Sequence, residues 1–158
     1  MVKKIINAIG LNRSITRIAV EIIEENNSYK NNLIFVGTEN AGNEIAKRLA
    51  NAIEDLEDIS IPVITLEQLT KEKGEVSDKI VVLVTKVISK GWLIEEAINK
   101  ILSLGKPRSI QLAVLIDRGH RELPIGANYI GKNVPTAKSE FVEVRLNEID
   151  GEDAVYLQ

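Results

Sequence analysis

Short apolar runs alternate along the chain with stretches in which apolar positions recur every three or four residues. The clearest run is Ile80 to Val84, IVVLV, and an unbroken β-branched run of this kind is typical of a parallel strand buried on both faces. Residues 92–102 repeat apolar positions at helical spacing, and Gly105 and Pro107 predict where that helix ends. The pattern therefore predicts a buried strand, a loop over Thr85 to Gly91, and a helix.

The same alternation continues on both sides of this unit. It predicts helices over about residues 14–25, capped by Asn12 or Ser14, and over about 41–52. Polar residues 67–79 connect two strands and have room for one helical turn. Further apolar runs predict strands at 33–36, 59–66, 109–116 and 128–131, and a C-terminal hairpin at 141–146 and 154–157. Strands that alternate with helices indicate an α/β fold with a doubly wound, mainly parallel sheet, which the hairpin would extend in antiparallel fashion.

Length and composition narrow the class of protein. A chain of 158 residues, 44% of them hydrophobic, predicts one domain over 1–158. No cysteine is present, which excludes disulfides and thiolate chemistry. A net charge of −3 gives no overall attraction to nucleic acid, so such binding needs a local basic patch. The chain shows neither the apolar core of a signal peptide nor a run of about 20 apolar residues, so we expect a cytoplasmic protein with no membrane partner.

The loop between the central strand and its helix is the first candidate site. It is expected at the carboxyl edge of the sheet and at a helix N-terminus, where backbone amides and the helix dipole favour anions. Many such turns in α/β proteins bind nothing, so this position alone does not fix a function. The candidate ligands for an anion or a nucleotide are Ser89, Lys90, Gly91, Asp117 and Arg118.

A long segment of the chain is similar to one known family. Lys106 to Glu140, KPRSIQLAVLIDRGHRELPIGANYIGKNVPTAKSE, resembles the pyrimidine operon attenuation protein family (PyrR), whose members are often also uracil phosphoribosyltransferases. The resemblance continues through residues 144–146 and 150–157, and upstream it includes ITRIA at 15–19 and AKRLA at 46–50. It implies a type I phosphoribosyltransferase fold and a homo-oligomer.

The residues that perform catalysis in that family are altered here. The resemblance implies two adjacent acids that hold the ribose hydroxyls of phosphoribosyl diphosphate, but Thr85 and Lys86 occupy those positions. In the phosphate-binding turn at 90–93 only the glycine remains. An ammonium group cannot accept hydrogen bonds from a diol or bind the magnesium of a diphosphate. We therefore expect no catalytic residue, no metal site and no cofactor, with magnesium only if some phosphoribosyl diphosphate binding persists. Trp92 is expected to fill space as an apolar plug.

Two further differences affect the same reaction. In the turn from Gly37 to Gly42 the family has a basic loop that holds the diphosphate, whereas this chain carries Glu39, which repels a polyphosphate. The connection between Thr65 and Lys79 is also shorter than the hairpin that closes over the substrate in the family. Together these differences predict a family member without phosphoribosyltransferase activity.

Members of the family regulate by binding a messenger RNA hairpin on a basic face. Of the residues that the resemblance assigns to that face, the chain retains Thr16, Arg17, His120, Arg121 and Lys132. Val20, Glu25 and Gly126 stand where basic residues or a histidine are typical, which reduces the number of phosphate contacts. An alternative interpretation is that the turn at 117–121 only braces its own loop, with Asp117 as the salt partner.

The leading hypothesis is a catalytically inactive, PyrR-like regulatory protein that forms homo-oligomers and binds an mRNA hairpin, a uridine nucleotide or phosphate. One alternative is an active uracil phosphoribosyltransferase with an altered site. Another is a non-catalytic scaffold protein whose retained property is self-association.

Overall fold

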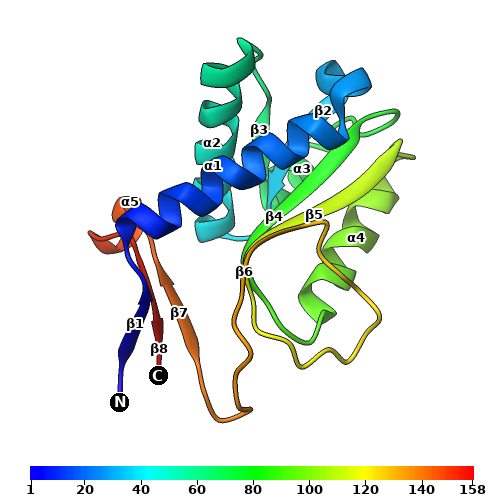
Figure 1. Cartoon of the computed structure of the whole chain (residues 1–158). Coiled ribbons are helices and arrows are strands. Elements are labelled where there is room, and N and C mark those ends of the chain that lie inside the picture. The colour runs from blue at the N-terminus through cyan, green and yellow to red at the C-terminus, as the bar shows by residue number, and fades with distance from the viewer.

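A parallel sheet of five strands forms the centre of the protein (Figure 1). The computed structural model describes all residues, Met1–Gln158. The strand order is β3-β2-β4-β5-β6, and every neighbouring pair is parallel. The strands are β2 (Leu33–Gly37), β3 (Val63–Thr65), β4 (Ile80–Ile88), β5 (Ser109–Asp117) and β6 (Tyr129–Asn133). The predicted doubly wound α/β sheet is confirmed.

Helices cover both faces of this sheet. On one face, α1 (Ala8–Glu25) and α2 (Asn40–Glu57) pack against the strand residues Phe35, Val82 and Val84. On the other face, α3 (Leu66–Lys71) and α4 (Trp92–Leu104) pack against a separate cluster that contains Val81 and Leu83. Successive residues of a strand point to opposite faces, so the continuous apolar run in β4 supplies both clusters.

The C-terminal hairpin forms a sheet of its own. Strands β7 (Val142–Arg145) and β8 (Ala154–Leu157) pair in antiparallel fashion around the short helix α5 (Asn147–Asp150). Strand β1 (Lys3–Ile6) pairs with the other side of β8, so that the order is β1-β8-β7 (Figure 1). The predicted hairpin is confirmed, but it does not extend the parallel sheet, and the hydrophobic pattern did not predict β1.

Several predicted boundaries were wrong. Helix α1 begins at Ala8, with Asn7 as its cap rather than Asn12 or Ser14, because the Asn7 side chain accepts from the Gly10 amide at 2.9 Å. Helix α2 continues to Glu57, and the predicted strand at 59–66 is reduced to β3 at the sheet edge. A 3-10 helix, η1 (Asn27–Asn32), follows α1. Strand β4 continues to Ile88, so Thr85 and Lys86 lie in a strand and the loop is shortened to residues 89–91.

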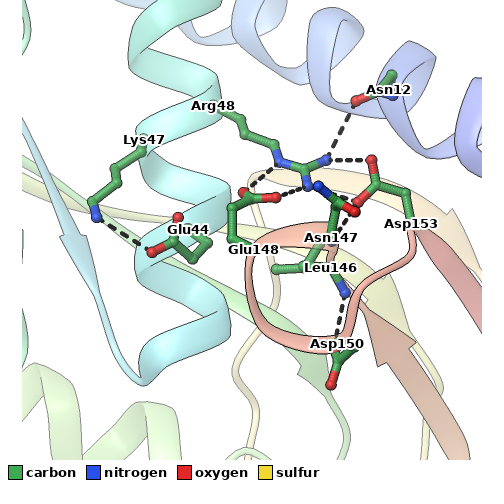
Figure 2. Close-up of polar contacts among 9 residues, drawn as sticks. All are labelled: Asn12, Glu44, Lys47, Arg48, Leu146, Asn147, Glu148, Asp150 and Asp153. Carbon is green, nitrogen blue, oxygen red and sulfur yellow. Dashed lines mark hydrogen bonds and ion pairs between the residues drawn. The ribbon is translucent and has the colours of Figure 1, made fainter.

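An arginine on α2 connects the main body to the small sheet (Figure 2). Arg48 contacts both carboxylate oxygens of Glu148, with Nε at 3.0 Å from Oε2, and both of Asp153, at 2.7 and 3.1 Å. It also donates to Asn12 of α1 at 3.3 Å. These hydrogen bonds hold the pKa of Glu148 and that of Asp153 below their usual range. The network fixes the turn between β7 and β8 against both helices.

None of the helices has the length and apolar character needed to cross a membrane.

Candidate functional site

A pocket of about 600 Å³ opens at the carboxyl ends of β2 and β4 and beside the start of α4. It lies where the strand order places two strand-to-helix turns next to each other, which is the usual ligand position in such sheets. Its wall combines polar residues of the strand ends with apolar residues of α4. Among the lining residues are Thr38, Glu39, Thr85, Ser89, Gly91, Trp92 and Arg118.

The carboxylate of Glu39 occupies the corner between β2 and β4. Its Oε1 accepts from the Gly42 amide at 2.8 Å and from the Lys86 amide at 3.3 Å. Its Oε2 accepts from the hydroxyl of Thr85 at 2.9 Å and from that of Thr38. Glu39 is thereby the N-cap of α2. The donors that an external anion would need at this corner already bind a negative charge of the protein itself.

The two altered acid positions differ in their surroundings. Thr85 is buried and its hydroxyl is bound by Glu39. Lys86 is exposed, and it forms no ion pair with any residue. Neither side chain supplies a carboxylate where the resemblance implies one. No group of three or more His, Cys, Asp or Glu residues is placed to hold a metal ion.

Four of the five anion candidates line the pocket together. Ser89, Lys90 and Gly91 form the turn, and Gly91 precedes α4 in the left-handed region with φ 105°. Arg118 faces them from the end of β5.

The fifth anion candidate, Asp117, does not line the pocket. It is held by Arg121 in two hydrogen bonds of 3.0 and 2.7 Å. Burial raises the pKa of Asp117, but the hydrogen bonds from Arg121 and from the Gly119 amide outweigh burial and lower it. The side chain is therefore a charged structural partner of Arg121.

The prediction for Trp92 was wrong. The residue is 53% exposed rather than buried as a plug, and it lines the pocket. The indole Nε1 donates to the carboxylate of Glu122 at 2.9 Å. An exposed indole with its N–H fixed offers an aromatic surface to a ligand.

The five RNA candidates fall into two groups. Thr16 and Arg17 lie on α1 and Lys132 on β6, and Arg17 donates to the carbonyls of Ile130 and Gly131 on that strand. His120 and Arg121 lie in the loop after β5.

The contacts of these candidates are mainly internal. Arg121 binds Asp117 and also donates to the carbonyls of Ser89 and Ile125, at 2.9 and 2.6 Å. His120 Nε2 lies 2.6 Å from the Thr136 carbonyl oxygen. These contacts are those expected if the turn braces its own loop, while RNA contact by the same residues stays a prediction. Lys132 is exposed and forms no ion pair.

The sequence analysis did not identify two residues near the pocket that Trp92 and Arg118 line. Glu122 accepts the hydrogen bond of the Trp92 indole, and Lys138 lines a neighbouring pocket together with Arg118. Both lie inside the segment that resembles the family, but neither was assigned to a site there, so only their positions in the fold identify them. The N-cap role of Glu39 had no such signal either, because Ser, Thr, Asp and Asn are the usual cap residues.

Solved structures of phosphoribosyltransferases resemble this chain. HGPRTase from Leishmania tarentolae in complex with GMP matches with a TM-score of 0.79 over 99% of this chain and 97% of that chain, at 17% identity. The hypoxanthine phosphoribosyltransferase of Trypanosoma cruzi in complex with IMP gives 0.79 over 99% and 90%, at 18% identity. These matches establish the type I phosphoribosyltransferase fold.

Proteins found by sequence comparison have a much higher sequence identity to this chain than those solved structures have. The protein named bifunctional protein PyrR of Pelotomaculum thermopropionicum is 47% identical over 98% of this chain and 94% of its own length. Those of Alkaliphilus metalliredigens and Streptococcus suis are 47% and 42% identical, over 94% and 98% of this chain and 91% and 96% of their own lengths. The alignment with the first of these runs over 171 positions, so that relative has residues that this chain lacks. No family model matches the chain. Identity of this extent along nearly the whole chain shows that it belongs to the PyrR family.

Proposed function

We propose that this chain is a cytoplasmic regulatory member of the PyrR family that binds a uridine nucleotide in the strand-end pocket and does not transfer phosphoribosyl groups. The observation that carries the proposal is the position of Glu39. Its carboxylate accepts hydrogen bonds from two backbone amides and two hydroxyls at the corner between β2 and β4. A diphosphate would have to displace this internal anion, or lie against it at the cost of like-charge repulsion.

The other groups of the pocket do not replace the donors that Glu39 occupies. Transfer of a phosphoribosyl group requires the sugar to be positioned and the departing diphosphate to be stabilised electrostatically. Thr85 is already bound to Glu39, and Lys86 carries a positive charge where the resemblance implies an acid. The pocket still has Lys90, Arg118 and the exposed ring of Trp92. Those groups can bind a nucleotide without performing the reaction.

The activity is tested by incubating the chain with uracil, phosphoribosyl diphosphate and magnesium, with the P. thermopropionicum relative assayed in parallel. We expect uridine monophosphate formation no faster than in buffer. A variant that combines Thr85→Asp, Lys86→Asp and Glu39→Thr restores the acids and removes the internal anion, and we expect tighter binding of phosphoribosyl diphosphate in calorimetry. Turnover by the unmodified chain above the buffer rate would contradict the proposal.

A second candidate is an active uracil phosphoribosyltransferase. The observation that favours it is that the relatives, at up to 47% identity, are named bifunctional proteins. The same assay separates the two candidates, because only this one predicts turnover by the unmodified chain.

We further propose that the chain self-associates and binds an RNA hairpin through a basic surface that includes Arg17 and Lys132. Lys132 is exposed without a carboxylate partner, so its charge is available to a phosphate. We expect Lys132→Ala to weaken binding in a gel shift and to reduce the salt dependence by about one counterion. Lys71→Ala on α3 is the control.

An oligomer that shifts no hairpin and gains no thermal stability from uridine nucleotides would instead support the scaffold alternative.

A further inference from the structure

A second, wholly polar pocket lies beside the first. It has a volume of about 420 Å³, and no apolar residue lines it. Its lining includes Ser89, Lys90, Arg118, His120, Glu122 and Lys138. Ser89, Lys90 and Arg118 also line the larger pocket, so the two share a wall. A polar pocket adjoining a partly apolar one suits a ligand with a charged end and an organic end.

The charges of this second pocket are not balanced internally. Arg121 also lines it, but Asp117 neutralises that guanidinium. Arg118 binds only uncharged oxygens, those of the Thr136 hydroxyl at 3.1 Å and of the Glu140 carbonyl at 2.8 Å among them. Its positive charge therefore has no carboxylate partner.

The two lysines add to this excess. Neither Lys90 nor Lys138 takes part in an ion pair. The one unpaired carboxylate in the lining is Glu122, which accepts the hydrogen bond of the Trp92 indole. Three uncompensated cations against one carboxylate leave a net positive charge of about two, which matches a phosphate dianion.

The segments that carry these charges are held in place before any ligand arrives. His120 adopts a left-handed backbone conformation with φ 62°, and its ring binds the Thr136 carbonyl. Arg118 binds the same segment, which leads to Lys138. Arg121 joins the loop to the Ser89 carbonyl. The guanidinium of Arg118 is therefore fixed and loses little conformational entropy on binding, which favours affinity.

We propose that this second pocket binds the phosphate group of a small phosphomonoester, whose organic part extends over the shared wall toward Trp92. The site shares only Lys90 with the turn at 90–93 that the resemblance assigns to a phosphate, because its other two uncompensated cations, Arg118 and Lys138, lie after β5. The phosphate could belong to inorganic phosphate or to a nucleoside monophosphate. The choice of uridine monophosphate as a probe rests on the proposed function, whereas the inorganic phosphate probe does not.

Trp92 provides the measurement, because it is the only tryptophan of the chain. A dianion in the second pocket repels the Glu122 carboxylate and loosens its hydrogen bond to the indole. We expect inorganic phosphate or uridine monophosphate to change the fluorescence saturably. Saturation by inorganic phosphate identifies the phosphate group as sufficient, and saturation by the nucleotide alone shows that the organic part is needed. Either result supports the proposal.

Variants test whether the second pocket is responsible. We expect Lys138→Ala to raise the Kd about five- to tenfold, as for loss of one partly exposed charged partner. Glu122→Gln keeps an acceptor for the indole and removes the repulsion, so it should lower the Kd. The control is Lys106→Ala, an exposed lysine without an ion pair at the opposite end of β5. No saturable change with either probe, or unaltered affinity in Lys138→Ala, would overturn the proposal whatever the transferase assay shows.

Discussion

Replacement of Arg48 by methionine is expected to lower the free energy of unfolding by about 2 kcal/mol. The side chain is only 17% exposed and bridges Glu148, Asp153 and Asn12. Removing one partner of a buried ion pair typically costs about 3–5 kcal/mol because it leaves a buried charge unpaired. We reduce that figure because the Glu148 side chain is 36% exposed and can be hydrated. Urea denaturation with an unchanged m-value gives the measurement.

Lys47→Met on the same helix is the matched control. Lys47 pairs only with Glu44, one turn away, and its side chain is 53% exposed. Such surface pairs contribute about 0–1 kcal/mol. Equal stability of the Arg48 and Lys47 variants would show that the network does not fasten the small sheet to α2.

The destabilisation by Arg48→Met should also depend on pH. Arg48 lowers the pKa of Glu148 and of Asp153 in the folded state. A depressed carboxyl pKa stabilises the fold above the unfolded value, and that contribution is lost as the pH falls through the folded value. The stability difference between the unmodified chain and Arg48→Met should therefore be largest near neutral pH and shrink below about pH 4. Unfolding curves at a series of pH values measure this.

The elements that the sequence predicted best are those whose signal is local. The apolar run Ile80–Val84 needs burial on both faces, and it is the core of β4. Its extension to Ile88 depends on pairing with β5, where Val87 lies opposite Ile116. Strand β1 was missed for the same reason, because its partner β8 lies at the other end of the chain. Pairing between distant segments leaves no periodic pattern in a strand of four residues.

The candidate site was likewise predictable only where a single residue carried the signal, and not where distant segments meet. The resemblance placed a diphosphate at the Gly37–Gly42 turn, the charge of Glu39 predicted that it is disfavoured there, and the altered residues at 85 and 86 were evident from the same resemblance. The hydrogen bond between Glu39 and Thr85 was not predictable, because it requires the parallel register that sets Gly37 opposite Val84. The exposure of Trp92 follows from its place as the first residue of α4, on the pocket side rather than toward the sheet.

Gly42→Ala is expected to destabilise the chain by about 2 kcal/mol and to disturb the corner at Glu39. A Cβ at this position would lie 2.3 Å from the Val84 carbonyl oxygen and 2.8 Å from Glu39 Oε1. Alanine is the better helix former by up to about 1 kcal/mol, but overpacking against rigid backbone typically costs about 1–3 kcal/mol or more. The steric term should dominate because the start of α2 cannot move without breaking the hydrogen bonds of Glu39.

Gly126→Ala is the control for this substitution. A Cβ on Gly126 would meet no atom within 4 Å, and its φ is not positive, so we expect a change below about 0.5 kcal/mol. Chemical denaturation of the two variants gives the comparison. If Gly42→Ala were as stable as the unmodified chain, α2 would not abut β4 at Val84. Glu39 would then not lie beside Thr85, and the proposal that an internal carboxylate excludes the diphosphate would lose its structural basis.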